Sequence, residues 1–345
     1  MPLLVKRFRK IYEKIFFKKL MKKYDVIGIG SPLLDFTVEV DDSILAEMNL
    51  KKGEMHLIDE NKSKEILKKL EDYEIKITPG GSAANTLAGV RLLGGNAAFL
   101  GKIGKDENGN IYEQKTNEQK VNSRLSKHES ISTGNTITFI TPDSERTFTT
   151  HLGASLYFRK EDISEEDIKN SKILHIEGYQ LEDPELKETA IHAMKIAKEN
   201  NVKISIDLAD PALIRRNLES LKKIIQDFAD IVFANEAEAE VFTGKKEEDA
   251  LNELYNVCEI AIVKLGEKGS LIKADEKIYK IPINKVNVIN TNGAGDAYAA
   301  GILHAIANNL EIEKAGKIAA YISSQVVASA GARLDKNIKE EINNL

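Results

Sequence analysis

The chain has 345 residues, of which 42% are apolar and 30% charged, a composition typical of a folded protein with a substantial core. Its net charge of −5, with no basic excess over the main body, argues against nucleic acid as a partner. The single cysteine, Cys258, excludes an intrachain disulfide and a thiolate metal cage. No apolar run reaches the roughly 18 residues that a membrane span needs. We therefore expect a cytoplasmic protein.

The first 20 residues differ from the rest of the chain, because they carry seven Lys or Arg against one Glu, with Phe8, Ile11, Ile15 and Phe16 interleaved. This pattern fits an amphipathic surface helix that contacts anionic lipid, or an extension without function in a chain that starts at Met21. It lacks the apolar block of a secretory signal. We favour the second interpretation and treat residues 1–22 as a basic N-terminal extension.

The first half of the chain predicts a strand, a lid and a helical layer. Apolar residues over 24–30 predict a buried strand that runs into a loop. Residues 34–58 and 133–152 alternate between apolar and polar side chains, with a turn at 142–144 in the second segment. Between them we expect a helix over 82–93, a strand over 97–103 and a helix over 106–119. Alternation favours a sheet with one face in water, so the two segments predict a small antiparallel β lid.

The second half predicts a parallel sheet. Short apolar strands are expected over 173–176, 203–207, 231–234 and 260–265, with helices over 185–200, 212–228 and 236–257 between them. This alternation favours an α/β fold with a mostly parallel central sheet flanked by helices on both faces. We predict one domain over residues 23–335, which includes the lid, and a C-terminal helix or tail over 336–345.

Two common phosphate-binding motifs are excluded. A P-loop needs a glycine five residues before its Gly-Lys pair and a hydroxyl residue after it, and neither 101–102 nor 104–105 meets this spacing. The dinucleotide fingerprint begins at Gly28-Ile29-Gly30, but Leu33 replaces its third glycine and Pro32 stands where the helix should begin. A dehydrogenase is therefore disfavoured.

The segment Asn290–Tyr298 reads NTNGAGDAY and precedes an apolar helix. Its small residues Gly293, Ala294 and Gly295 allow backbone amides to converge on one anion at the helix start, where the helix dipole is positive. Asp296 then places a carboxylate beside that anion. A kinase needs this pairing of a base with phosphoryl-binding donors. The alternative is a capped helix after a tight turn, and this segment alone does not decide between the two.

A second glycine-rich helix start, TPGGSAAN, spans residues 78–85. Gly80 and Gly81 allow close approach of a ligand to the backbone, and Asn85, one turn into the helix, offers both a donor and an acceptor.

Together these segments resemble the ribokinase-like (PfkB) kinases. Residues 80–106 resemble the first signature of that family and residues 290–296 the second. Gly30–Asp35 is similar to the early strand end that carries the family's substrate-binding Asp, and Asn235-Glu236-Ala237-Glu238 to its N-x-x-E element. The resemblance covers about residues 24–333. It implies an ATP-dependent phosphotransferase with an alcohol group as acceptor, and the intact Asp296 argues against a non-catalytic regulator.

The resemblance also implies roles for single residues. Asp296 would be the catalytic base, with the amides of Gly293, Ala294 and Gly295 as the anion hole, and the lid would close over a substrate held by Asp35, Gly80, Gly81 and Asn85. The nucleotide and its Mg²⁺ would be bound by Asn235, Glu238, Lys264, Gly266, Gly269 and Thr291. Two positions depart from the family pattern: Lys264 replaces a threonine, and Asn290 replaces an aspartate that helps relatives bind a monovalent cation. Whether such a cation activates this protein is therefore open.

The substrate is less well defined than the reaction. The stretches G-S-P-L-L-D at 30–35 and T-N-G-A-G-D at 291–296 are similar to those of adenosine kinases and their bacterial relatives. A nucleoside base needs an apolar slot, for which Phe36, Met55, Leu57 and Phe148 are candidates in the lid, although a lid that packs on itself would use the same residues. Glu177, by contrast, falls where sugar-specific relatives place an acid that binds a hydroxyl, and the alternative is a surface acid at a strand end. We therefore expect adenosine as the acceptor, with a fructokinase- or ribokinase-type sugar as the alternative.

The six histidines show no metal-ligand spacing, so the only metal expected is the Mg²⁺ that accompanies ATP. The sequence does not decide between a monomer and a homodimer.

Overall fold

In the computed structural model, residues 22–334, 336 and 338–343 are described, so the predictions for residues 1–21 lie outside the described part. A nine-stranded sheet forms the core, in the order β14-β13-β12-β11-β10-β9-β1-β5-β6. Its neighbours are parallel except at β12–β13 and β13–β14, which are antiparallel. The strands are β1 (Tyr24–Ile29), β5 (Ala97–Gly104), β6 (Asn122–His128), β9 (Ser171–Glu177), β10 (Lys203–Asp207), β11 (Ile231–Asn235), β12 (Ile260–Lys264), β13 (Ser270–Ala274) and β14 (Lys277–Ile281).

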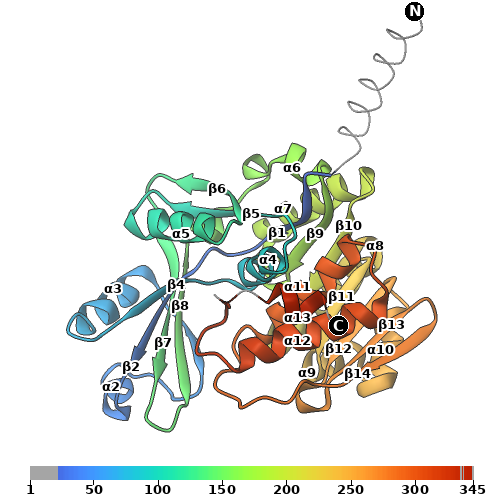
Figure 1. The fold of residues 1–345 in the computed structure, drawn as a ribbon. Helices are drawn as coiled ribbons and strands as arrows, with labels where there is room; N and C mark the ends of the chain where they lie inside the picture. Colours follow the sequence, from blue (N-terminus) through green and yellow to red (C-terminus); the bar gives the residue numbers. More distant parts are fainter. Residues whose placement is uncertain (1–21, 335, 337, 344–345) are drawn as a thin grey trace, which may run out of the picture.

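Both faces of this sheet are covered by helices (Figure 1). Alternate strand residues such as Val26 and Phe233 pack against α4 (Ser82–Leu92), α11 (Ala294–Ala307) and α12 (Ile312–Val327). The intervening residues, such as Ile27 and Ile206, pack against the opposite layer, which includes α6 (Glu165–Lys169), α7 (Pro184–Glu199), α8 (Pro211–Phe228), α9 (Glu236–Thr243) and α10 (Glu247–Tyr255). The predicted mostly parallel sheet with helices on both faces is confirmed. Near the C-terminus, α13 (Lys339–Asn343) begins after Ile338, whose buried side chain packs with α12.

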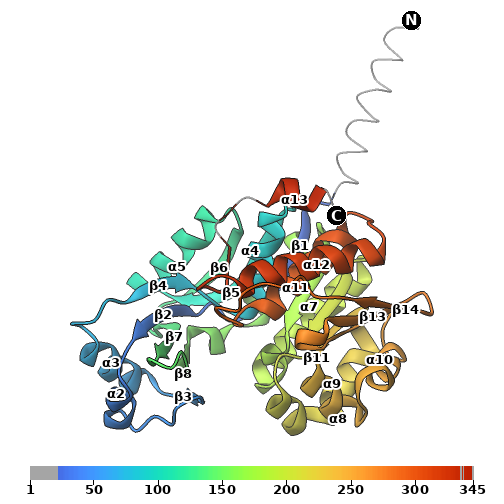
Figure 2. The same cartoon turned by 60° about the horizontal axis from the view of Figure 1, so that its bottom comes forward.

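A second sheet of five strands forms the lid, in the order β3-β8-β7-β2-β4. The strands are β2 (Leu34–Glu39), β3 (Met55–Leu57), β4 (Lys76–Pro79), β7 (Thr133–Ile140) and β8 (Arg146–Gly153). One face of this sheet is covered by α2 (Asp42–Glu47) and α3 (Glu60–Lys69), which lie on the side away from the core sheet (Figures 1 and 2). The other face is not covered by a helix of the described chain.

Three sequence predictions need correction. The lid is mixed rather than antiparallel, because β2 pairs parallel to β7 and β3 parallel to β8, and residues 76–79 supply a strand that the alternation did not reveal. The helix predicted over 236–257 is two helices, because Gly244 adopts a left-handed conformation (φ 73°) and ends α9. The hairpin of β13 and β14 was not predicted.

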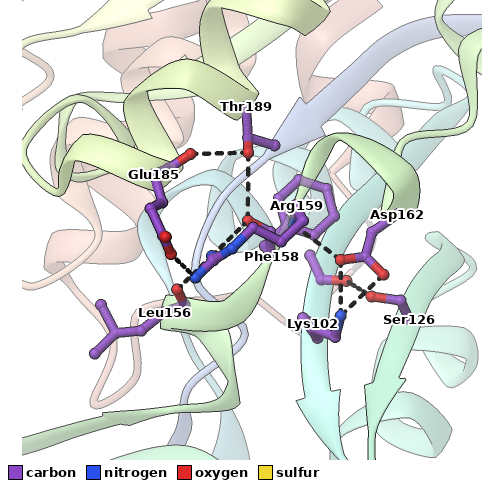
Figure 3. A network of polar contacts seen from close by, with 9 residues as sticks. Lys102, Ser126, Leu156, Phe158, Arg159, Asp162, Glu185 and Thr189 are labelled. Atoms are coloured by element: carbon purple, nitrogen blue, oxygen red, sulfur yellow. Dashed lines mark hydrogen bonds and ion pairs between the residues drawn. The ribbon is translucent and has the colours of Figure 1, made fainter.

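The connection that follows the lid is tied to the core by a polar network (Figure 3). After β8 the chain passes through two short 3-10 helices, η1 (Ala154–Tyr157) and η2 (Lys160–Asp162). Asp162 accepts hydrogen bonds from Lys102 Nζ on β5, at 2.8 and 3.0 Å, and from the amide of Arg159. The Arg159 guanidinium contacts Glu185 on α7. One base of the lid is thus anchored to both β5 and α7.

Asp106 anchors the lid at the start of β7. Its side chain caps α5 (Glu107–Glu118) by accepting from the Gly109 amide at 2.8 Å, and it also accepts from the amide and the hydroxyl of Thr133. In this fold the residue joins a core helix to a lid strand.

Candidate active site

The candidate site lies at the carboxyl ends of the core strands, where the strand order reverses. From β1 the chain runs to β5 on one side and later to β9 on the other, and ligands of open α/β sheets bind at such a reversal. The last side chains on the α4–α11 face of the neighbouring strands are polar. They are Glu177, Asp207, Asn235 and Lys264, and the register pairs Glu177 with Asp207 and Asn235 with Lys264. Sheet topology therefore gathers four polar groups that are far apart in sequence.

Asp296 lies in the first turn of α11 and is held by α4. Its Oδ1 accepts from the Ser82 hydroxyl at 2.7 Å, and its Oδ2 accepts from Asn85 Nδ2 at 2.8 Å. Burial raises the pKa of Asp296, although the bonds from Ser82 and Asn85 oppose that shift. The result is an oriented carboxylate of raised basicity, as a general base requires.

The glycine turn before α4 adjoins Asp35. A Cβ atom on Gly80 would lie 2.3 Å from Oδ2 of Asp35, and one on Gly81 (φ 92°) would lie 2.3 Å from the Ser31 carbonyl oxygen. Only glycine fits at either position. Burial raises the pKa of Asp35 to about 7, with Arg333 lowering it and Asp296 raising it, so both of these charged groups are near the Asp35 carboxyl. The predicted substrate-binding residues Asp35, Gly80, Gly81 and Asn85 are thus brought together.

Glu177 is in the same region but is fully engaged with the backbone. Its side chain is 2% exposed, Oε1 accepts from the Ser31 amide at 2.7 Å, and Oε2 accepts from the Ala83 amide at 2.9 Å. Burial raises its pKa to about 7, and the two amide bonds oppose that shift. The alternative of a surface acid at a strand end is therefore wrong. Glu177 joins the loop after β1 to the start of α4.

The glycine turn at residues 293–295 begins α11. Gly293 has a left-handed φ of 76°, and a Cβ there would lie 2.5 Å from the carbonyl oxygen of Ala332. The Ala294 amide donates to the Thr291 carbonyl at 3.2 Å. The amides of Gly293 and Gly295 are therefore the freer donors at this helix start, where a bound anion is favoured.

Lys264 places an ammonium group beside this turn. A Cβ on Gly295 would lie 3.2 Å from Lys264 Nζ, which donates to Asp207 Oδ2 at 3.0 Å. Both side chains are largely buried, with 16% of Lys264 and 8% of Asp207 exposed. Burial lowers the pKa of Lys264, but the carboxylates of Asp207 and Glu238 outweigh it, so the net shift is upward. Lys264 is therefore charged at neutral pH.

Asn235 and Glu238 bind each other. Glu238 accepts from the amide of Asn235 at 2.7 Å and from its Nδ2 at 2.6 Å, while Asn235 Oδ1 caps the amide of Glu238 at 2.9 Å. Burial raises the pKa of Glu238 to about 7, and Asp207 adds to the shift. Among the described residues no group of three or more His, Cys, Asp or Glu side chains is arranged to hold a metal ion. The donor set fits a cation that arrives with its own phosphate ligands.

A cavity of about 640 Å³ adjoins the glycine turn that begins α11. The predicted residues Lys264, Gly266, Gly269 and Thr291 line it, together with Ala294 and Gly295. The wall opposite them was not predicted and is formed by Ile281, Ile283, Val286, Val288, Tyr298 and Val327. An apolar slot that ends at an anion site has the shape and polarity that a nucleotide needs.

Two polar residues of the site were missed from the sequence. Asp207 ends a predicted strand, so the gathering of parallel-strand ends could have revealed it. Arg333 follows α12 in a loop without any local motif. Its Nε donates to Asn85 Oδ1 at 2.7 Å and its Nη2 donates to the Gly80 carbonyl at 3.3 Å.

Comparison with known proteins decides the family. Residues 48–339 match the model of the pfkB family carbohydrate kinases. The chain belongs to this family. It is 27% identical to an adenosine kinase of Dictyostelium discoideum over 334 residues, which cover 90% of this chain and 97% of that one. It is 29% identical to a 5-dehydro-2-deoxygluconokinase of Listeria monocytogenes over 262 residues, or 72% of this chain and 80% of that one.

A solved structure is similar over almost the whole fold. The adenosine kinase from Sinorhizobium meliloti superposes with a TM-score of 0.85 at 30% identity, covering 93% of this chain and 99% of that one. The ribokinase-like fold expected from the two signatures is therefore confirmed. As a pfkB kinase, the protein is a phosphotransferase that uses ATP to phosphorylate a hydroxyl group of a small molecule. Among the described residues, no helix is long and apolar enough to cross a membrane.

Proposed function

We propose that this kinase phosphorylates adenosine with Mg-ATP and produces AMP. The observation that carries the choice of acceptor is the uncovered face of the lid. In the sheet register Asp35 pairs with Thr136, Thr136 with Thr150, and Thr150 with Leu57. The next row joins Phe148 to both Thr138 and Met55. Register partners point to the same face, so Phe148 and Met55 lie in the row next to the one that begins at Asp35.

This face offers what a nucleoside requires. Met55 and Leu57 are 54% and 67% exposed, although apolar side chains of this size are usually buried. A flat base between the lid and the core would cover them while the ribose hydroxyls meet Asp35 and the glycine turn. Phe36 does not take part, because it lies on the opposite face of β2 and is buried in the lid's own core. It was wrongly included among the candidates for the base slot.

The proposed mechanism uses the geometry at the start of α11. Asp296 accepts the proton of the acceptor hydroxyl, and the amides of Gly293 and Gly295 stabilise the charge on the transferred phosphoryl group. The nucleotide occupies the 640 Å³ cavity, with its phosphates toward Gly295 and Lys264. Mg²⁺ carried by ATP would supply further charge neutralisation, and Glu238 and Asn235, which bind each other, are the residues that would interact with it.

A sugar or sugar acid is the second candidate, since the relative from Listeria monocytogenes is a 5-dehydro-2-deoxygluconokinase. The geometry of Glu177 disfavours it. Both oxygens of Glu177 accept backbone amides and Gln180 also donates to Oε1, so this buried carboxylate serves to join the loop after β1 to α4.

The test is ADP production from Mg-ATP with adenosine, inosine, guanosine, ribose, fructose and 5-dehydro-2-deoxygluconate. We expect turnover with adenosine, and a Leu57→Ser variant should raise the KM for adenosine about tenfold or more, since about 1.5–3 kcal/mol accompanies burial of a leucine. Tyr73→Ser, a change of an exposed residue that follows α3, is the matched control and should leave KM unchanged. Turnover with a sugar and none with adenosine would refute the choice of acceptor.

A further inference from the structure

Arg333 contacts three separate points of the fold: Asn85 on α4, the Gly80 turn before it, and Gln119 after α5. Besides Nε on Asn85 and Nη2 on the Gly80 carbonyl, its Nη1 donates to Gln119 Oε1, just past the end of α5. Every nitrogen of the guanidinium is therefore engaged. A planar group with a fixed fork of donors imposes its own geometry on its partners, which a lysine cannot do.

The contact to Asn85 determines which way that amide points. Because Asn85 Oδ1 accepts from Arg333, its Nδ2 is turned toward Asp296. The reverse orientation would place Oδ1 against the Asp296 carboxylate, where two acceptors repel each other. Arg333 therefore adds a second contact that favours the same orientation of the Asn85 amide and holds it in place.

The contact to Gly80 acts on the acceptor side. The Gly80 carbonyl accepts from both Arg333 and the Tyr112 hydroxyl, the latter at 2.8 Å, and the Gly80 backbone abuts the Asp35 carboxylate. Burial lowers the pKa of Arg333, and the nearby carboxylates of Asp35 and Asp296 oppose that shift. Arg333 thus contacts Gly80, which adjoins Asp35, and Asn85, which holds the Asp296 carboxylate.

We propose that Arg333 is a positioning residue for phosphoryl transfer, which holds the base through Asn85 and the acceptor through Gly80. The proposal rests on the proposed function only in requiring a hydroxyl acceptor that Asp296 deprotonates. It is independent of whether that acceptor is adenosine or a sugar. The assays use whichever acceptor the substrate panel identifies, so a failure of adenosine would leave this test intact.

The neighbourhood of Arg333 permits a chemical rescue experiment. A cavity of about 510 Å³ lies beside it, lined by Asn85, Arg333 and residues of α4 and α12. Truncation in Arg333→Ala would enlarge this cavity toward Asn85 and leave room for a free guanidinium ion. We expect kcat/KM to fall about 100-fold, the order of loss that accompanies a misplacement of about 1 Å. Methylguanidinium at millimolar, non-denaturing concentration should raise the kcat/KM of Arg333→Ala at least tenfold.

Controls separate alignment from folding. Arg91→Ala is the matched variant, because Arg91 lines the same cavity but donates to Gly95 and Asn96 rather than to site residues. It should keep wild-type kcat/KM and show no response to methylguanidinium. Arg333→Lys retains a charge near Asp35 but lacks the planar set of donors of a guanidinium. Compared with Arg333→Ala, its acceptor KM should therefore be closer to wild type than its kcat.

The outcomes are distinct. Rescue of Arg333→Ala by methylguanidinium, and not by equal urea or ammonium, supports the proposal. Values of kcat and acceptor KM within twofold of wild type in Arg333→Ala would overturn it. So would a loss that methylguanidinium does not restore in a variant whose Tm is unchanged. If Arg333→Ala does not fold, Arg333→Lys decides, and a kcat equal to wild type in that variant would overturn the proposal.

Discussion

Lys264 offers the sharpest test of how phosphate charge is neutralised in this chain. Its ammonium lies beside Gly295 at the start of α11, lines the 640 Å³ cavity and pairs with Asp207 at 3.0 Å. In the proposed mechanism the phosphoryl group lies between the nucleotide and Asp296, so we expect Lys264 to contact the γ-phosphate. Lys264→Met keeps a similar chain length and removes only the charge and its hydrogen bonds.

The expected loss of kcat in Lys264→Met follows from the removal of one hydrogen-bond donor to the phosphoryl group, on which charge develops in the transition state. Such a loss costs about 10²- to 10³-fold in kcat, or about 3–4 kcal/mol. The change also leaves Asp207, which is 8% exposed, without its partner, and breaking a buried pair destabilises a protein by roughly 3–5 kcal/mol. The double variant Lys264→Met, Asp207→Asn removes both charges. It should regain much of the stability without regaining kcat.

The assay is steady-state ADP release together with calorimetric Kd values for ATP and ADP, and Tm as a measure of folding. We expect ATP to bind about tenfold more weakly to Lys264→Met while the ADP affinity changes by less than twofold, because only ATP carries the γ-phosphate. Equal weakening of ATP and ADP would contradict this placement of Lys264. A folded variant with kcat within threefold of wild type would do the same.

Three other predictions concern the base, pH and cations. Asp296→Asn should lower kcat by ~10²–10⁴-fold while the Kd for ATP stays nearly constant, since a general base acts in the transition state; a matching loss of ATP binding would show a structural role instead. Burial raises the pKa of both Asp35 and Glu177 to about 7, so the folded state retains protons that the unfolded state has lost. Their stabilising contribution is full below about pH 4 and is lost as pH rises through 7; urea unfolding at pH 5, 6 and 7.5 should show this decline, and Glu177→Gln should flatten it, whereas an unchanged slope would contradict the assignment. Asn290 donates to the Ala330 carbonyl at 3.0 Å and accepts from the Asn292 amide at 2.9 Å, so its neutral side chain already braces the loop. Replacing K⁺ with tetramethylammonium should therefore change turnover by less than twofold, and a larger loss would show that a cation site persists.

The sequence by itself determined the reaction chemistry and the fold class. The glycines at 80, 81 and 293 are needed because any side chain there would collide with Asp35, Ser31 or Ala332, and such a local requirement is visible in the sequence. The alternation of apolar strands and helices after residue 170 predicted the parallel sheet for the same reason, since burial on both faces leaves a local pattern. Asp296, one residue after the second glycine turn, is the base that this local pattern predicts.

Only the tertiary structure decided which groups meet across the fold. Arg333 reaches Asn85 over 248 positions and Asp207 reaches Lys264 over 57, and neither pair has a spacing that a local pattern could reveal. The same holds for the faces of the lid: the register with β7 and β8, not the sequence of β2, places Asp35 in the row of Leu57 and turns Phe36 to the opposite side. Glu177 was found as a polar residue at a strand end, but the two amides that engage it come from segments 94 and 146 residues away. Side-chain chemistry and backbone freedom are local properties of a chain, whereas hydrogen-bond partners depend on strand order and register, which long-range packing sets.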